Sequence, residues 1–224
     1  MRKDLLVEGE IYHIFNKSIA GYTIFNEESN FFRMLNVICF YRKQKPKSSF
    51  SQFIKLSEVK TTNSGFLSSS LRVSNSNEKE KLVEIVAYCL MPTHFHLILR
   101  QLKENGIAVF ISNVQNSYTR YFNLRHKRKG PLWEGRFQSV LVESDEQLLH
   151  LTRYIHLNPV TAYLVNKPED WSVSSYQEYL LTTDKKICKY EDLLDIKPPS
   201  YKEFVEDRIS YQKELAKIKD LIIE

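Results

Sequence analysis

Four short stretches of this chain are rich in apolar residues and lie between more polar segments. Residues 10–17 are rich in β-branched and aromatic side chains, and residues 82–90, 94–100 and 136–143 share this character. Such stretches, bounded by turn-forming residues, are typical of β-strands. The residues Met91-Pro92-Thr93 separate the second stretch from the third. We therefore expect four strands, two of which are joined by a tight turn.

Three other stretches carry apolar residues at spacings of three and four, which predicts amphipathic helices. These are residues 27–43, residues 106–126 and a helix that begins at Ser144. Ser144 and Gln147 fit a capping box at the start of this last helix. Pro159 is expected to end it, because the residue before a proline is biased away from helical backbone.

The order of these elements predicts an α+β fold: a ferredoxin/RRM-like antiparallel sheet with helices packed on one face. Residues 1–180 are expected to form this domain. Residues 44–80 are dominated by serine, threonine, asparagine and lysine, which indicates an insertion or long loop with short order around 50–59. Residues 181–224 are expected to form a helical C-terminal extension.

Composition indicates an ordinary globular protein. The chain has 224 residues, of which 42% are hydrophobic and 26% charged. We found no window of eighteen consecutive apolar residues and no secretory signal, so no membrane partner is expected. The three cysteines, Cys39, Cys89 and Cys188, are widely spaced and odd in number. They suggest a reducing, cytoplasmic compartment and no disulfide framework.

Positive charge is modest overall but concentrated in one place. The formal net charge is +5, and residues 120–136 hold six basic residues interleaved with aromatic ones. Basic groups beside aromatics suit a phosphate backbone with unstacked bases. The alternative is a solvated helix end followed by a basic turn. The residues we predict to contact DNA are Arg120, Lys127, Arg128, Lys129 and Arg136.

Two histidines flank one aromatic residue in the third strand. Side chains two apart share a face of a strand, so His94 and His96 point the same way, about 7 Å apart at their Cα atoms. Phe95 points into the opposite layer. Two neutral imidazoles on a rigid strand can form half of a metal site. The alternatives are ordinary core histidines or zinc with Cys89, but Cys89 is more typical of a small packed hydrophobe.

Tyr154 and Asn158 lie four residues apart on the helix that begins at Ser144. They share one flank if the helix persists as far as Asn158. A tyrosine hydroxyl can act as a nucleophile, and an amide oxygen can bind a divalent ion. Tyr118 and Tyr121 compete as nucleophiles, but their spacing fits core packing or base stacking.

Three further histidines lie near these groups. His150 and His156 could assist proton transfer, but both are expected to be solvated helical residues. His13 neighbours the histidine strand if the two strands pair, and the sequence assigns it no role.

Four ordered motifs resemble one family. The segments Leu90–Leu97, Gly130–Phe137, Tyr154–Val160 and Trp171–Tyr176, together with Tyr12–Ile14 in the first strand, resemble the single-tyrosine HUH transposases. The closest likeness is to the REP-associated tyrosine transposase branch. The chain departs from the family pattern in its long serine-rich stretch and in a threonine at position 93, where the family commonly has asparagine.

The resemblance implies a mechanism. His94 and His96, with Asn158 as third ligand, would hold Mg²⁺ or Mn²⁺ at the scissile phosphate of hairpin-containing single-stranded DNA. Tyr154 would attack phosphorus to form a 5′-phosphotyrosine and release a 3′-hydroxyl. A homodimer and a monomer both stay open.

Two other functions compete with a transposase. A rolling-circle replication initiator or relaxase would use the same chemistry, and a non-catalytic nucleic-acid-binding domain could share the fold. The single tyrosine helix favours the transposase, and a pure binder has no use for the four site residues. The transposase interpretation makes a geometric prediction: both imidazoles should face the helix that carries Tyr154, and Phe95 should face away.

Overall fold

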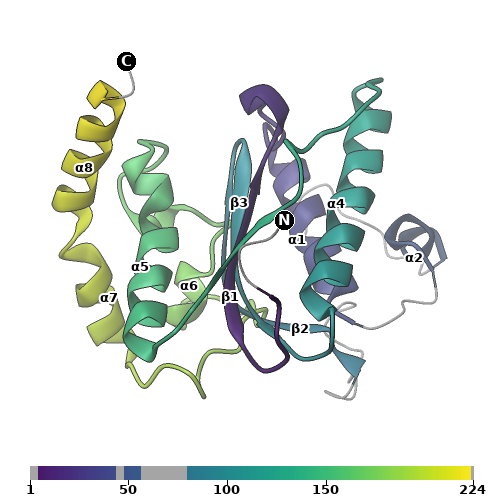
Figure 1. The fold of residues 1–224 in the computed structure, drawn as a ribbon. Helices are drawn as coiled ribbons and strands as arrows, with labels where there is room; N and C mark the ends of the chain where they lie inside the picture. Colours follow the sequence, from purple (N-terminus) through teal and green to yellow (C-terminus); the bar gives the residue numbers. More distant parts are fainter. Residues whose placement is uncertain (1–4, 44–47, 57–79, 223–224) are drawn as a thin grey trace.

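The computed structural model describes residues 5–43, 48–56 and 80–222 and centres on one antiparallel sheet. Its strands lie in the order β2-β3-β1-β4 (Figure 1). They are β1 (Ile11–Lys17), β2 (Val83–Met91), β3 (His94–Gln101) and β4 (Gln138–Leu141). All four predicted strands and the α+β class are confirmed, although β4 is shorter than the expected stretch 136–143.

The three predicted helices also form. They are α1 (Glu28–Tyr41), α4 (Gly106–Arg125) and α5 (Asp145–Thr161). Further helical elements accompany them: η1 (Ile19–Gly21), α2 (Phe50–Leu56), η3 (Pro168–Asp170), α6 (Tyr176–Tyr179), α7 (Pro198–Glu206) and α8 (Ile209–Ile222). None of the helices in the described part of the chain combines the length and hydropathy needed to cross a bilayer.

The structure bears only in part on two predictions, the insertion at 44–80 and the extension beyond residue 180. Helix α2 falls within the predicted insertion 44–80, but most of that stretch lies outside the described residues. Beyond residue 180, α7 and α8 agree with a helical extension. The boundary at 180 stays a prediction.

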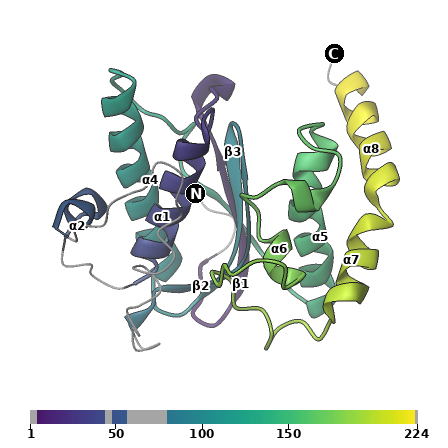
Figure 2. The same cartoon turned by 180° about the vertical axis from the view of Figure 1, so that it is seen from behind.

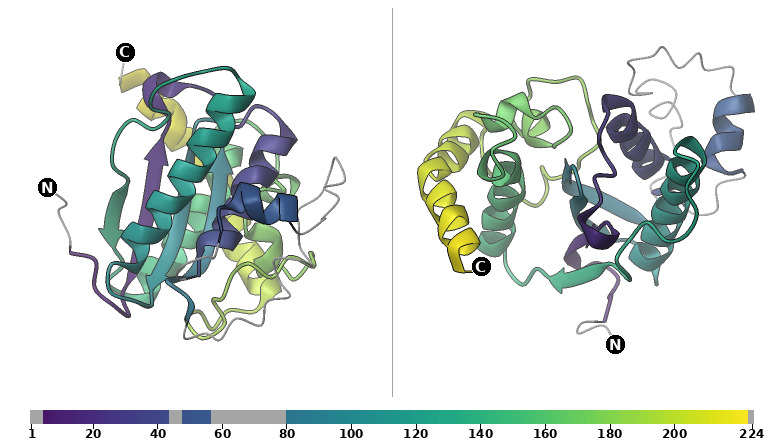
Figure 3. Two further views of the ribbon diagram at one scale, coloured as in Figure 1. Left: turned by 90° about the vertical axis from the view of Figure 1, so that its right-hand side faces the viewer. Right: turned by 90° about the horizontal axis from the view of Figure 1, so that it is seen from above.

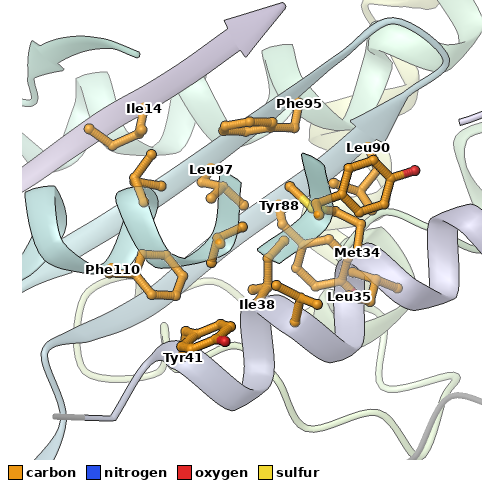
Figure 4. Packing of buried hydrophobic residues seen from close by; sticks show 14 of the residues in the cluster. Ile14, Met34, Leu35, Ile38, Tyr41, Tyr88, Leu90, Phe95, Leu97 and Phe110 are labelled. Carbon is orange, nitrogen blue, oxygen red and sulfur yellow. The ribbon is translucent and has the colours of Figure 1, made fainter. Parts of the chain in front are cut away.

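One face of the sheet is covered by α1 and α4, which enclose the larger apolar core. Phe95 and Leu97 of β3 point into this core beside Ile38 of α1 and Phe110 of α4 (Figure 4). Gly106 begins α4 where the helix meets the sheet end, because a Cβ there would lie 2.4 Å from the Leu82 carbonyl oxygen.

The second face of the sheet is covered as well, which corrects the expectation of helices on one face only. Helix α5 packs on this face, with α7 and α8 outside it (Figures 2 and 3). The physical reason lies in β2, which is buried along its whole length. A bulge between Ile85 and Ala87 shifts its alternation, so that apolar residues of β2 supply both cores.

Helix α5 begins as predicted but ends later. The Ser144 hydroxyl accepts a hydrogen bond from the Gln147 amide at 3.1 Å, as in a capping box. Pro159 does not end the helix, which continues to Thr161. A proline inside a helix removes one N–H donor, and the next turn re-forms here through a 2.9 Å bond from the Ala162 amide to the Asn158 carbonyl. Asn158 therefore sits one helical turn after Tyr154.

His156 is fully buried, so the expectation of a solvated histidine is wrong at this position. Its Nδ1 lies 2.7 Å from the Tyr201 hydroxyl of α7, and its Nε2 lies 2.7 Å from Ser175 Oγ. Ser175 Oγ also accepts from the Tyr88 amide of β2 at 2.9 Å. Burial lowers the pKa of His156 to about 3. A neutral imidazole thus ties α5 to its neighbours, whereas His150 is half-exposed, as expected.

Candidate active site

The pairing of β1 with β3 brings three histidines together on the face that α5 covers. His94 and His96 point to this face, and Phe95 packs on the other side with its ring centroid 5.4 Å from that of Trp133. His13 of β1 adjoins them, with its Nε2 2.9 Å from His96 Nδ1. The predicted orientation of the histidine strand is confirmed, and His13 joins the cluster.

Tyr154 lies over this cluster from α5. Its ring centroid is 5.9 Å from that of His96 and 6.4 Å from that of His13. The side chain is 45% exposed, so its hydroxyl remains reachable by a ligand. Burial raises the pKa of Tyr154, and contact with the Asn158 side chain opposes this shift. The tyrosine therefore keeps its proton at neutral pH.

The three histidines are neutral at physiological pH. Burial lowers the pKa of His13 to about 4. Burial, with the neighbouring His13 and His94, holds the pKa of His96 well below its usual value. Burial and the nearby Lys17 lower the pKa of His94. Neutral imidazoles are the form that can donate a lone pair to a metal ion.

Each candidate ligand histidine has a partner on its Nδ1. His96 Nδ1 lies 2.9 Å from His13, and His94 Nδ1 lies 3.0 Å from Thr93 Oγ1. If Nδ1 carries the proton, Nε2 is the nitrogen left to bind an ion, which is the usual arrangement of metal-binding histidines. Thr93 therefore contacts the histidine strand at the position where the sequence departs from its family.

His94 and His96 alone do not complete a site for a divalent ion. A third ligand other than a His, Cys, Asp or Glu side chain is needed. Within the described residues, no group of three or more His, Cys, Asp and Glu side chains is placed to hold a metal. The Asn158 amide would have to complete the pair of imidazoles. Its Nδ2 is buried and has no hydrogen-bond partner in the described structure; because this group is an N–H donor, the metal ligand would be the amide oxygen. Two imidazoles and an amide leave positions open for phosphate and water.

The competing assignments are settled by burial. Cys89 is fully buried, with its Sγ 3.8 Å from Met91 Sδ, and burial raises the pKa of its thiol. It packs as a small hydrophobe, as expected. Tyr118 is also buried, and its hydroxyl donates to the Ile24 carbonyl at 2.7 Å. The Tyr121 hydroxyl donates to Asn30 Oδ1 at 3.0 Å. Both tyrosines are packing residues.

A pocket of about 750 Å³ opens beside the histidines and Tyr154. Lys17, Glu134 and Arg136 line its wall, and Lys17 Nζ lies 2.9 Å from Glu134. Sequence reasoning missed Lys17 and left His13 without a role. Both lie on the same face of β1, as the alternation of side chains along a strand predicts. That this face meets the histidines follows only from the pairing of β1 with β3.

The motif Gly130–Phe137 forms the pocket wall because it is bonded to β1. The Glu134 amide donates to the Lys17 carbonyl at 3.0 Å, and Asn16 Nδ2 donates to the Gly135 carbonyl at 3.1 Å. These bonds hold the segment beside the histidine strand. They place Arg136 at the pocket.

The predicted DNA-contact residues separate into three groups. Arg136 is exposed and lines the pocket. Arg120, Lys127 and Lys129 are exposed on α4 and just after it, and they do not line this pocket. Arg128 donates to Asn123 Oδ1 at 3.0 Å and to the Pro131 carbonyl at 2.7 Å. It holds the turn after α4 together.

Comparisons with known proteins find similarity to transposases. Residues 68–158 match the family model described as transposase IS200 like. A Haemophilus influenzae protein named as a REP-associated tyrosine transposase is 33% identical over 104 residues, which cover 42% of this chain. The match spans 58% of that relative's length.

A solved structure shares the fold. It is a REP-associated tyrosine transposase bound to a REP hairpin, and it superposes with a TM-score of 0.52 at 15% sequence identity. The superposition covers 88% of this chain and 94% of the other. The resemblance predicted from the motifs is thereby confirmed.

Proposed function

We propose that this chain, a relative of the REP-associated tyrosine transposases by sequence and by fold, is a metal-dependent single-stranded DNA endonuclease and strand transferase. One observation carries the proposal. Tyr154, His94 and His96 come from two separate segments of the chain and line one pocket, and the Asn158 side chain contacts Tyr154. A nucleophile and two neutral imidazoles then face one reachable space.

The metal site would consist of His94, His96 and Asn158. A bound Mg²⁺ or Mn²⁺ would polarise the scissile phosphate and stabilise the charge that develops on it. The neutral state of both imidazoles supports this assignment. His13 would act as a positioning residue, because its contact with His96 Nδ1 fixes the ring.

Tyr154 would carry the covalent step. Its hydroxyl oxygen attacks phosphorus and loses its proton, the bond from phosphorus to the 3′-oxygen breaks, and that oxygen leaves as a 3′-hydroxyl after taking up a proton. The 5′-phosphotyrosine keeps the energy of the broken phosphodiester. Attack by another 3′-hydroxyl reverses the step and joins two strands, so no nucleotide cofactor is needed.

Positive groups at the pocket wall would hold the DNA backbone. Lys17 and Arg136 both line the pocket, so they would meet the phosphates next to the scissile one. The solved relative binds a REP hairpin, and we propose hairpin-containing single-stranded DNA as the substrate here. Because Tyr154 faces the histidines of its own chain, a single copy would suffice for chemistry and a homodimer would not be required.

A covalent adduct is the test of this function. The protein is incubated with a labelled single-stranded hairpin oligonucleotide and Mn²⁺ and then denatured. We expect a labelled protein band from the wild type, none from Tyr154→Phe, and an undiminished band from Tyr163→Phe, which alters an exposed tyrosine just beyond α5. An adduct that survives Tyr154→Phe, or none with any hairpin tried, would overturn the proposal. A binding-only domain would retard the DNA without an adduct.

A further inference from the structure

A second cavity lies next to the active-site pocket and has no role in the chemistry proposed above. It has a volume of about 530 Å³ and lies between α4 and the segment 131–137. This volume falls within the range of about 300–1,000 Å³ that is usual for ligand clefts. We call it the α4 groove. Its α4 wall consists of Ala108, Ser112, Gln115, Asn116 and Thr119.

The α4 wall of this groove is a continuous polar stripe. Positions 112, 115, 116 and 119 follow the spacing that puts side chains on one face of a helix. All four side chains are neutral amides or hydroxyls that can donate and accept hydrogen bonds. The opposite wall includes Trp133 and Phe137, and Arg136 is the charged residue among those that line the groove.

Part of the hydrogen-bonding capacity in this wall is unused. Thr119 Oγ1 accepts from Trp133 Nε1 at 3.1 Å, but the buried Gln115 Nε2 has no partner in the described part of the chain. Asn116 is exposed, and its Nδ2 makes only a long 3.3 Å bond to Ser112 Oγ. A phosphate would need positive charge, which this wall lacks. A nucleobase needs neutral donors and acceptors at its edge, which this wall supplies, and apolar surface at its faces, which Trp133 and Phe137 of the opposite wall supply.

The groove is continuous with the active site. Gly135, Arg136 and Phe137 line both cavities. A DNA strand whose phosphate lies beside Tyr154 could therefore cross this shared wall and place a neighbouring base in the groove. Arg136 stands at the crossing point, where the backbone between the two sites would pass.

We propose that the α4 groove holds one unstacked nucleobase of the strand bound in the active site, and that Gln115 and Asn116 read its edge. This inference rests on the proposed function, because it takes the strand from the active site. It adds a sequence-specific contact that the chemistry itself does not require.

The test is selection from a pool of hairpin oligonucleotides that carry eight randomised nucleotides on each side of the stem. Binding is measured without divalent metal, and the bound DNA is sequenced. We expect the wild type to show a base preference at one or two flanking positions. In Gln115→Ala/Asn116→Ala, one preference should fall by about tenfold, in keeping with the loss of an amide–base pair, while the others persist.

Two control variants define the result. Asn113→Ala removes a neutral amide from the same helix outside the groove lining and should leave all preferences unchanged. Gln115→Glu replaces a donor by an acceptor, so it should move the preference toward a base that offers a donor. This second variant keeps the side chain's volume and serves if the double alanine variant folds poorly.

The outcomes separate this inference from the proposed function. Wild type that binds and forms the adduct, but shows no base preference or one unaffected by both groove variants, would overturn the groove alone. Failure of the wild type both to bind any hairpin in the pool and to form an adduct would instead defeat the proposed function, and the groove with it.

Discussion

The two faces of the sheet are built from the same strands but do different work. On β3, Phe95 and Leu97 point into the apolar core under α1 and α4, while His94 and His96 point toward α5. The first face is apolar packing. The second holds three neutral histidines, a half-exposed tyrosine and a pocket. One strand thus separates scaffold from chemistry by its alternation alone.

The second face also contains a buried polar network, in which His156 bridges Tyr201 and Ser175. Buried polar groups are tolerated when each has a partner. Here the partners come from α5, α7 and the segment before α6, so this network fixes the helix that carries Tyr154 over the histidines.

The largest contrast is expected between neighbours on β3. His96→Ala should lower adduct formation by about a hundredfold to a thousandfold, since it removes stabilisation of the developing charge, while lowering the free energy of unfolding less than Phe95→Ala does, because His96 lines the pocket. Phe95→Ala should instead cost about 3–5 kcal/mol of stability. Adduct yield and denaturant unfolding of both variants test this. Similar loss of stability in the two would break the division between faces.

The next largest effect is expected in the polar network. His156→Ala should lower the free energy of unfolding by about 3 kcal/mol, because it leaves a cavity and unpaired partners. His150→Ala, on the same helix but half-exposed, should stay within about 0.5 kcal/mol of the wild type. Urea unfolding of both variants measures this. Equal effects would show that the network does not hold α5.

The contact between His13 and His96 should tune metal affinity. His13→Phe removes the partner of His96 Nδ1, and second-sphere losses of this kind weaken metal binding by about 10–100-fold. His13→Gln, which keeps an acceptor, should lose less. Titration calorimetry with Mn²⁺ gives the affinities without any need for DNA. Unchanged affinity in His13→Phe would remove His13 from the site.

The smallest effects are expected at the exposed basic residues. Lys129→Ala should weaken hairpin binding a few-fold for all sequences and reduce the salt dependence by about one unit of slope. Arg128→Ala should chiefly lower stability, because its guanidinium holds the turn after α4. Binding isotherms at several salt concentrations separate the two. A base-specific loss in Lys129→Ala would contradict a pure phosphate contact.

Much of this arrangement could be predicted from local sequence patterns. Strand alternation predicted which way His94 and Phe95 point, and helical spacing placed Asn158 one turn after Tyr154. These are short-range properties of a regular backbone. The role of His13 could not be predicted, because it depends on the register between two strands about eighty residues apart.

Tertiary packing overrode two local expectations. Pro159 weakens α5 locally, but the helix continues because both sides of that turn are buried. His156 has the polarity of a surface residue, yet partners at 175 and 201 allow it to be buried. The helices on the second face are held by such long-range contacts, which local patterns do not reveal. Local patterns therefore predicted helices on one face of the sheet only.

The central claim is that Tyr154 becomes joined to a 5′-phosphate of single-stranded DNA. The most direct measurement compares hairpin oligonucleotides labelled at the 3′ end or the 5′ end, incubated with protein and Mn²⁺, denatured, and mapped by peptide mass spectrometry. We predict that the 3′ label stays with the protein, that the 5′ label is released, and that the modified peptide contains Tyr154. Retention of the 5′ label, or attachment at another tyrosine, would contradict the account.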